Sequence, residues 1–170
     1  MLYYCQYVSP IGELLLTGDG THLTGVYMNH LPPENGENAE NQPLFQAAAQ
    51  WLDAYFRGED SPITFPLEPE GTAFQKKVWE ILREIPWGST RSYGEIAREM
   101  ADILGKKNMS AQAVGGAVGS NPISILIPCH RLVGAKGQLT GYAAGLDKKS
   151  WLLRHEGWQI QKNRVLETKE

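Results

Sequence analysis

The sequence contains few of the features that mark specialised protein classes. It has only two cysteines in 170 residues, far apart and in different surroundings, which excludes a scaffold built on disulfides. No apolar run approaches the roughly 20 residues of a membrane span. The opening MLYYCQYVSP lacks the charged and apolar segments of a secretory signal. We therefore expect a cytoplasmic protein without a membrane partner.

Basic residues are nearly absent from the first part of the chain. Residues 1–70 contain one basic residue, Arg57, and ten acidic ones, whereas residues 71–170 contain fifteen basic and nine acidic residues. This charge of −9 against +6 indicates that the second part meets an anion. A solvated surface with chance asymmetry is the alternative, since the basic part lacks the dense lysine and arginine run of an obligate nucleic-acid clamp.

The pattern of the first part predicts a small sheet and one helix. Short segments rich in Leu, Tyr, Val and Thr, separated by turn residues, predict an antiparallel meander over 2–8, 13–18 and 22–28. Residues 32–43 are polar and rich in breakers, which predicts a mobile loop. Apolar residues at helical spacing predict a helix over 44–58, and three prolines in 61–71 indicate a linker.

The pattern of the second part predicts helices with clear capping signals. These signals are the capping-box pairs and single caps Thr72 with Gln75, Ser92 with Glu95, Gly105 and Ser110. The helix that begins after Ser92 and the helix AQAVGGAVG after Ser110 form the outline of a helix-turn-helix. An apolar run over 121–128 predicts a buried strand that leads to Cys129, and 146–157 has the pattern of a last helix.

The predicted fold class is α+β, with two domains and a tail. We assign residues 1–66 to an acidic N-terminal domain with a small antiparallel β-sheet and a helix. Residues 67–157 form the second domain, which is mainly helical and carries a winged-helix-like helix-turn-helix. Residues 158–170 are expected to be a polar, loosely held tail.

Small residues dominate the helix predicted after Ser110. Glycine costs a helix about 1 kcal/mol relative to alanine, so the glycines of GGAVG need a reason. One reason is tight packing on a neighbouring helix. The other is a slim helix that enters a narrow space such as a DNA groove, in which case the adjacent Lys106 and Lys107 favour phosphates.

Cys129 lies in the stretch IPCHRLVG, between a proline and two basic side chains. A free cysteine is most often a buried, inert side chain. Reactivity needs the thiolate, which His130 and Arg131 close by would favour. A base that is oriented by a third group is the general way to activate a nucleophile, and His130 with Glu156 could supply that arrangement. Both interpretations of Cys129 stay open at this point.

The second part of the chain resembles the methylated-DNA–protein-cysteine methyltransferases, also called O6-alkylguanine-DNA alkyltransferases. The resemblance lies in the stretches FQKKVWEILREIPWGSTRSYGEIA, AVGGAVGSNPISILIPCHRLVG and GQLTGYAAGLDKKSWLLRHEG. They run almost unbroken over residues 72–157, and the first part matches the family's small N-terminal domain in general pattern. The PCHR core with an upstream Asn-Pro and a downstream Gly-Tyr is highly specific.

This resemblance implies a DNA repair protein that acts once and needs no cofactor. Cys129 would attack the alkyl carbon on O6 of a guanine flipped out of duplex DNA, and would keep the group as a thioether. His130 would take the thiol proton, in the family through a water, and Glu156 would orient His130. Asn121 would hold the segment that bears the thiol, and Tyr93 would donate a hydrogen bond to the departing guanine.

The resemblance also implies where the substrate lies. The residues expected to line the guanine pocket are Leu132, Tyr142, Ala143 and Val118. Those expected to contact DNA, through the minor groove, are Ser110, Ala111, Gln112, Lys106, Lys107 and Arg131. The implied partner is double-stranded DNA that contains O6-alkylguanine, bound by a monomer, and O4-alkylthymine is left open as a second substrate.

Three departures from the family pattern bear on specificity. Many members carry an arginine, which fills the space of the flipped base, where this chain has Gln112. Glutamine can hydrogen-bond the orphaned base but brings no charge. The connection from Tyr93 to Gln112 is longer than in compact members. Ala143 and Ala144 replace commoner residues in the pocket loop, which affects tolerance for bulky alkyl groups.

The sequence also contains features that bear on a metal site and on two alternative functions. Cys5, His22 and His30 are candidate zinc ligands, but a closed zinc site wants four ligands, so no metal is expected. A non-catalytic binder of alkylated DNA is the first alternative function, although relatives of that kind lack the cysteine. An unrelated Cys-His hydrolase is the second, and it would need an oxyanion hole and a substrate carbonyl.

Overall fold

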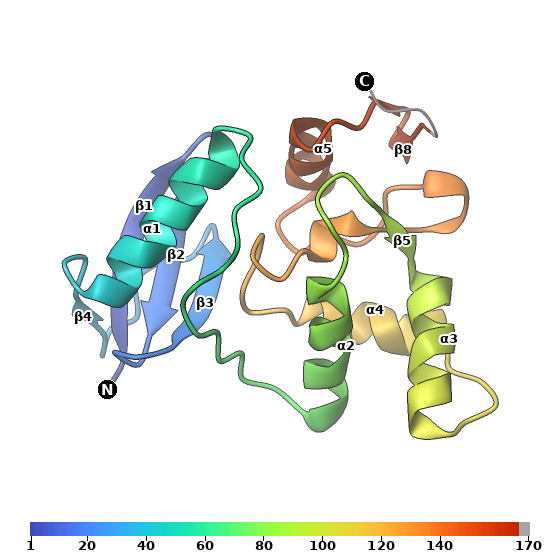
Figure 1. Cartoon of the computed structure of the whole chain (residues 1–170), viewed down its shortest axis with the longest axis horizontal. Coiled ribbons are helices and arrows are strands. Elements are labelled where there is room, and N and C mark those ends of the chain that lie inside the picture. The colour runs from blue at the N-terminus through green and yellow to red at the C-terminus, as the bar shows by residue number, and fades with distance from the viewer. Residues whose placement is uncertain (167–170) are drawn as a thin grey trace. The chain divides into compact units, whose positions relative to one another are not determined.

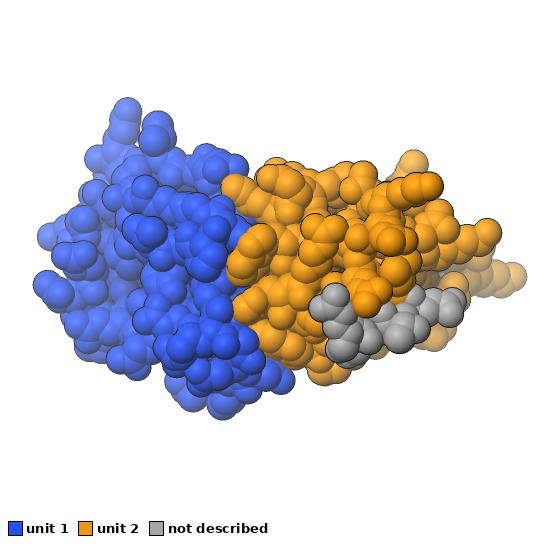
Figure 2. Space-filling view, turned by 90° about the horizontal axis from the view of Figure 1, so that it is seen from above, with its two compact units in different colours: residues 1–70, 122–126 blue, residues 71–121, 127–170 orange. Residues whose placement is uncertain are grey.

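The computed structural model describes residues 1–166 of the chain, which divide into two compact units (Figure 2). Unit 1 comprises residues 1–70 and 122–126, and unit 2 comprises residues 71–121 and the described residues from 127 onward. The first boundary lies at 70/71, rather than at the predicted 66/67, and the chain also returns to unit 1 for five residues between two stretches of unit 2. None of the helices among residues 1–166 is long and apolar enough to cross a membrane.

Unit 1 is the predicted sheet with one helix, and the fold class is α+β as expected. The sheet has the order β3-β2-β1-β4, and its first three strands are antiparallel. The helix lies along the sheet (Figure 1), and its buried residues recur at helical spacing. The elements are β1 (Tyr3–Ser9), β2 (Gly12–Gly18), β3 (Leu23–Met28), β4 (Glu37–Asn38) and α1 (Pro43–Phe56).

Two details of unit 1 differ from the sequence expectation. The predicted loop 32–43 contains β4, which pairs with β1 in parallel. The predicted strand over 121–128 is an isolated bridge between Val26 and Ile123, in which the Val26 amide donates to the Pro122 carbonyl at 2.9 Å. The apolar character of this stretch is explained by burial, because Ile123, Ile125 and Leu126 are at most 4% exposed.

Unit 2 is mainly helical and carries two short strand pairs (Figure 1). The strands β5 and β6 pair in parallel, and β7 and β8 form an antiparallel hairpin. Two short 3₁₀ turns, η1 and η2, flank β6. The elements are α2 (Ala73–Arg83), β5 (Arg91–Ser92), α3 (Tyr93–Leu104), α4 (Ala111–Gly119), η1 (Cys129–Arg131), β6 (Leu132–Val133), η2 (Ala135–Gly137), α5 (Leu146–His155), β7 (Ile160–Gln161) and β8 (Arg164–Val165).

The capping residues named from the sequence begin and end these helices. Thr72 and Gln75 form the reciprocal capping box of α2, and the Ser92 hydroxyl accepts from the Glu95 amide at the start of α3. Gly105 ends α3 with a left-handed backbone, φ 67°, a conformation that glycine adopts without strain. The Ser110 hydroxyl caps α4 by accepting from the Ala113 amide at 3.0 Å.

The expected polar tail over 158–170 is instead a hairpin as far as the structure describes it. Ile160 and Val165 pair across β7 and β8, and both are buried in a cluster with Val133, Leu139 and Leu153. These two apolar side chains are isolated in a polar sequence, so periodicity gave no signal for them. Residues 167–170 of the predicted tail lie outside the described part of the chain.

Candidate functional site

The segment that carries Cys129 is held by local main-chain geometry. Pro128, with φ −82° and ψ 64°, occupies the centre of an inverse γ-turn, in which the Cys129 amide donates to the Ile127 carbonyl at 2.8 Å. The Asn121 side-chain amide donates to the same carbonyl at 2.9 Å. Cys129 is 5% exposed. The proline and Asn121 therefore fix the thiol at the start of η1, below the surface of unit 2.

His130, Arg131 and Glu156 form a buried network beside the thiol. His130 Nε2 lies 2.7 Å from Glu156 Oε2, and Arg131 Nε donates to Glu156 Oε1 at 2.8 Å. Arg131 also donates to the Ile85 carbonyl at 2.6 Å. The side chains of His130 and Glu156 are fully buried. The network brings Glu156, from the end of α5, to His130 in η1, as the resemblance implied.

The charges of this network set the tautomer of His130. Burial would raise the pKa of Glu156, but His130 and Arg131 outweigh burial and hold that pKa well below its usual range. Burial lowers the pKa of His130, with Glu156 opposing. An anionic carboxylate can only accept, so a neutral His130 donates from Nε2 and keeps the lone pair on Nδ1. Nδ1 is buried and has no hydrogen-bond partner among residues 1–166.

Arg131 is buried, whereas the prediction of a DNA contact requires it at the surface. Its side chain is 10% exposed, and its guanidinium makes hydrogen bonds with Glu156 and with the Ile85 carbonyl. A guanidinium whose donors serve a buried carboxylate and a carbonyl is not presented to a phosphate. We therefore correct that expectation: Arg131 supports Glu156 from within.

Lys149 is a site residue that the sequence reasoning missed. It is 0% exposed, and its Nζ donates to the Thr140 carbonyl at 2.8 Å and to the Tyr93 hydroxyl at 3.4 Å. Burial lowers its pKa to about 8. The signal was available, because Lys149, Leu152, Leu153 and Glu156 follow the i, i+3, i+4, i+7 spacing of a buried helical face.

The surroundings of Cys129 favour the protonated thiol over the thiolate. Burial raises the pKa of Cys129, and both the hydrogen bond with Asn121 and the charge of Lys149 oppose that rise. Tyr93, also expected at the site, donates from its hydroxyl to the Thr140 carbonyl at 3.2 Å and to the Gly141 carbonyl at 3.3 Å. A thiol whose pKa is raised needs a base in order to react as a nucleophile.

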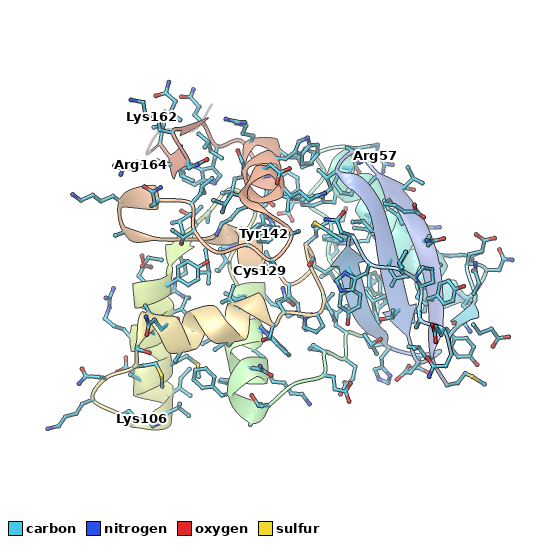
Figure 3. All side chains as sticks on the ribbon, turned by 180° about the vertical axis from the view of Figure 1, so that it is seen from behind. Arg57, Lys106, Cys129, Tyr142, Lys162 and Arg164 are labelled. Carbon is cyan, nitrogen blue, oxygen red and sulfur yellow. The ribbon has the colours of Figure 1, made fainter. Side chains whose placement is uncertain are left out.

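The residues expected to line the guanine pocket are placed in different ways. Tyr142 lies close to Cys129 (Figure 3), and the charge of a Cys129 thiolate contributes to the raised pKa of Tyr142, after burial. The Tyr142 hydroxyl is buried without a hydrogen-bond partner in the described chain. Leu132 and Val118 are buried, whereas Ala143 is exposed.

A cavity of about 550 Å³ opens between the start of α4 and the loop after η2. Ala111, Gln112 and Gly115 line it from α4, and Tyr93, Thr140 and Gly141 line it from the facing side. The glycines of α4 do not serve close helix packing, since a Cβ added at any of the three meets nothing within 4 Å. Ser110, Lys106 and Lys107 are exposed, and Figure 3 shows Lys106 at an end of the molecule distant from Cys129.

The candidate zinc ligands do not converge. Cys5 is buried in β1, His22 pairs with Asp19 at 3.2 Å, and His30 Nδ1 lies 2.9 Å from the Met28 carbonyl. Within residues 1–166, no group of three or more His, Cys, Asp or Glu side chains could hold a metal ion.

A buried cysteine followed by a His-Glu pair is an arrangement that can activate a thiol as a nucleophile. Sequence models of two domains match: "6-O-methylguanine DNA methyltransferase, ribonuclease-like domain" over residues 2–69, and the "DNA binding domain" of the same protein over residues 73–158. The chain therefore belongs to the methylated-DNA–protein-cysteine methyltransferase family.

Individual relatives agree with this assignment. The "Methylated-DNA--protein-cysteine methyltransferase" of Methanosarcina acetivorans is 45% identical and is covered over 99% of its length, with 92% of this chain. The protein of that name from Haemophilus influenzae is 43% identical, with 91% of this chain and 86% of the relative covered. The crystal structure of Mycobacterium tuberculosis OGT in complex with DNA matches with a TM-score of 0.80 and 42% identity, over 91% of this chain and 92% of that one.

Proposed function

We propose that this protein repairs alkylated guanine in duplex DNA by moving the O6-alkyl group to its own Cys129, once per molecule. The observation that carries the proposal is the Cys129, His130 and Glu156 arrangement, in which a buried thiol follows a tight turn and the adjacent imidazole keeps one nitrogen for a proton. The relatives named as methyltransferases, and the solved complex of one such protein with DNA, support it.

The proposed reaction is a displacement at the alkyl carbon. The Cys129 thiol loses its proton toward His130 Nδ1, directly or through a water, and the sulfur forms a bond to the alkyl carbon as the carbon–O6 bond breaks. The electron pair of that bond leaves with guanine, which regains a proton. Glu156 holds the imidazole and stabilises its charge, and Lys149 favours the developing thiolate. The thioether has no easy route to hydrolysis, so the reaction ends there.

We assign to Tyr93 the hydrogen bond that is donated to the departing guanine. The Tyr93 hydroxyl donates to the carbonyls of Thr140 and Gly141, so it must exchange these partners for the base. Lys149 donates to the same hydroxyl and carbonyl, and it can keep the Thr140 carbonyl bonded during that exchange. The pocket residues Tyr142, Leu132 and Val118 are proposed to surround the ring, and Ala143 leaves space at the exposed side.

The target atom is inaccessible in a duplex, so the nucleotide must be flipped out. The open glycine surface of α4 and the cavity beside it make α4 the proposed element in the minor groove, which is about 6 Å wide in B-DNA. Ser110, Ala111, Lys106 and Lys107 are proposed to contact the backbone, and Gln112, at the cavity wall, is proposed to fill the place of the flipped base. The protein is proposed to act as a monomer.

The intact mass of the protein tests this proposal. After incubation with duplex DNA that contains O6-methylguanine, we expect one added methyl group per molecule, located on Cys129, and no turnover. Cys129→Ser should gain no mass but keep DNA binding, because a hydroxyl is far less ionised than a thiol. Cys5→Ser is the matched control and should react normally. Unchanged mass with tight binding would support the lesion binder instead.

The role of Gln112 is separable from the chemistry. We expect Gln112→Ala to lower the second-order rate of thioether formation on duplex DNA, because extrusion costs a few kcal/mol and loses its compensation. The rate on the free O6-methylguanine base should change little, and Gln112→Arg should keep or raise the duplex rate. Equal losses on both substrates would mean that Gln112 shapes the pocket or the fold.

A further inference from the structure

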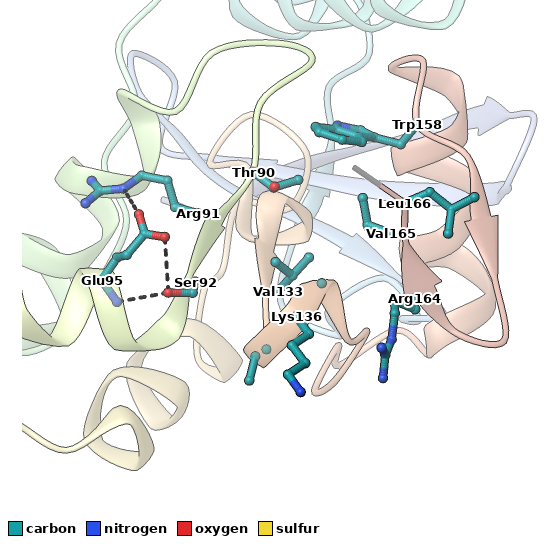
Figure 4. Close-up of a pocket in the computed structure, with 13 residues that line it drawn as sticks. Thr90, Arg91, Ser92, Glu95, Val133, Lys136, Trp158, Arg164, Val165 and Leu166 are labelled. Carbon is teal, nitrogen blue, oxygen red and sulfur yellow. Dashed lines mark hydrogen bonds and ion pairs between the residues drawn. The ribbon is translucent and has the colours of Figure 1, made fainter. Parts of the chain in front are cut away.

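A second and larger cavity of unit 2 lies beside the cavity at α4. It measures about 890 Å³, and it shares Ser92, Gly134 and Ala135 with the cavity that Gln112 lines. Its walls come from β5, from the η2 turn and from the β7–β8 hairpin (Figure 4). The two cavities therefore adjoin at these three residues, one extending toward the start of α4 and the other toward the C-terminal hairpin.

Two positive charges at the edge of the second cavity have no carboxylate partner among residues 1–166, and the one carboxylate that lines this cavity, Glu95, pairs with Arg91. Lys136 and Arg164 line it, and Figure 4 shows both side chains directed the same way, away from Trp158. Neither makes an ion pair with a carboxylate of residues 1–166. The third cation of the wall, Arg91, is occupied by Glu95 and Glu99. Thr90 adds a hydroxyl group to this wall, whereas the Ser92 hydroxyl donates to Glu95 at 3.3 Å.

The main-chain segments that carry Lys136 and Arg164 are held together by tight packing between the η2 turn and the hairpin. The Leu139 amide donates to the Asn163 carbonyl at 2.7 Å, and Arg164 donates to the Gln138 side chain at 3.3 Å. A Cβ added at Gly137 would lie 2.6 Å from the Val165 carbonyl oxygen, so only glycine permits this approach. Lys136 itself has a left-handed backbone, φ 56°, which persists only where the surroundings determine it.

We propose that Lys136 and Arg164 bind the phosphates of the lesion-bearing strand on one side of the flipped nucleotide. A strand whose base enters the cavity at Gln112 would pass over Ser92, Gly134 and Ala135, which both cavities share, and would reach the second cavity within a few nucleotides. Lysine, arginine and threonine side chains contact phosphodiester backbones, and Lys136, Arg164 and Thr90 line this cavity without a carboxylate partner among residues 1–166. The position of this phosphate site relative to the lesion rests on the proposed function. Its affinity for DNA does not.

The test is the salt dependence of DNA binding by full-length protein in the Cys129→Ser background. We expect Lys136→Gln/Arg164→Gln to make the slope of log K against log salt shallower by about 1.8, since each phosphate contact contributes about 0.9. Lys76→Gln/Lys162→Gln removes the same charge from exposed positions that do not line this cavity, and should leave the slope nearly unchanged. Lys136→Arg/Arg164→Lys keeps both charges and should restore the slope, which excludes misfolding as the cause.

Duplexes shortened on one side of the lesion locate the contact. The loss caused by Lys136→Gln/Arg164→Gln should disappear when one flank of the lesion strand is removed, and persist when the other is removed. An unchanged slope in this double variant, or equal losses with both shortened duplexes, would overturn the proposal. Failure of the proposed function is a different result, because then wild-type protein gains no alkyl mass on any substrate, whereas binding to undamaged duplex still reports the charge contact.

Discussion

The interiors of the two units differ in what they bury. Among the described residues, the one buried polar side chain of unit 1 is Thr17, whose hydroxyl is bonded to Thr24 at 2.9 Å. Unit 2 buries the side chains of His130, Arg131, Lys149, Ser150 and Glu156. The ion pairs of unit 1, such as Arg57 with Glu59, lie at the surface. Charge is thus kept outside in unit 1 and taken inside in unit 2.

Burying charged side chains costs free energy, and unit 2 bears that cost. Removing charges from water costs several kcal/mol per ion unless hydrogen bonds and opposite charges compensate. In unit 2 the compensation is nearly complete, because each oxygen of Glu156 accepts from a basic side chain. An apolar interior would be simpler to stabilise, so the polar interior of unit 2 fits the chemistry that we propose at Cys129 better than it fits a purely structural role.

The largest effect is expected from removing the buried carboxylate. Glu156→Ala leaves Arg131 buried without its partner and should lower the free energy of unfolding by about 3–5 kcal/mol, measured by urea denaturation near neutral pH. Glu156→Gln keeps a hydrogen-bond acceptor but not the charge, and should fall between the two proteins. A loss below about 1 kcal/mol would place this network with ordinary surface pairs.

A smaller and pH-dependent effect is expected from Lys149. Its pKa falls from the ordinary 10.5 to about 8 in the folded protein, so between these values the unfolded chain binds more protons and stability rises with pH. Between these two pH values, the free energy of unfolding of the protein with Lys149 should rise by up to about 3 kcal/mol relative to that of Lys149→Met. The comparison is made in Cys129→Ser, because the raised pKa of the thiol acts in the opposite direction. If the difference in the free energy of unfolding between the two proteins did not change with pH, burial would not have lowered the pKa of Lys149.

The smallest effect is expected in unit 1, as the matched control for Glu156. Glu59 also pairs with an arginine, at 2.6 Å, but both side chains are more than half exposed. Exposed pairs often contribute nothing measurable, so Glu59→Ala should leave the urea midpoint where it is. If Glu59→Ala and Glu156→Ala were equally costly, burial would not be what separates the two units.

The sequence by itself determined the local structure and the reactive residue. Turn residues, strand patterns and capping pairs act over a few positions, so the meander of unit 1 and the starts of α2, α3 and α4 could be predicted from them. The PCHR stretch placed the candidate nucleophile at Cys129 in the same way. The helical spacing of buried residues in α5 also indicates that Lys149 is buried.

Only the tertiary structure decided which distant groups meet. Glu156 lies 25 positions from Arg131, and whether a carboxylate or a phosphate receives that guanidinium depends on how α5 packs against η1, which no local pattern encodes. The return of residues 122–126 to unit 1 and the packing of Ile160 and Val165 with Leu139 and Leu153 are decided in the same way. Side-chain partners far apart in the chain are selected by burial and charge compensation in the folded core, and these exist only once the elements have packed.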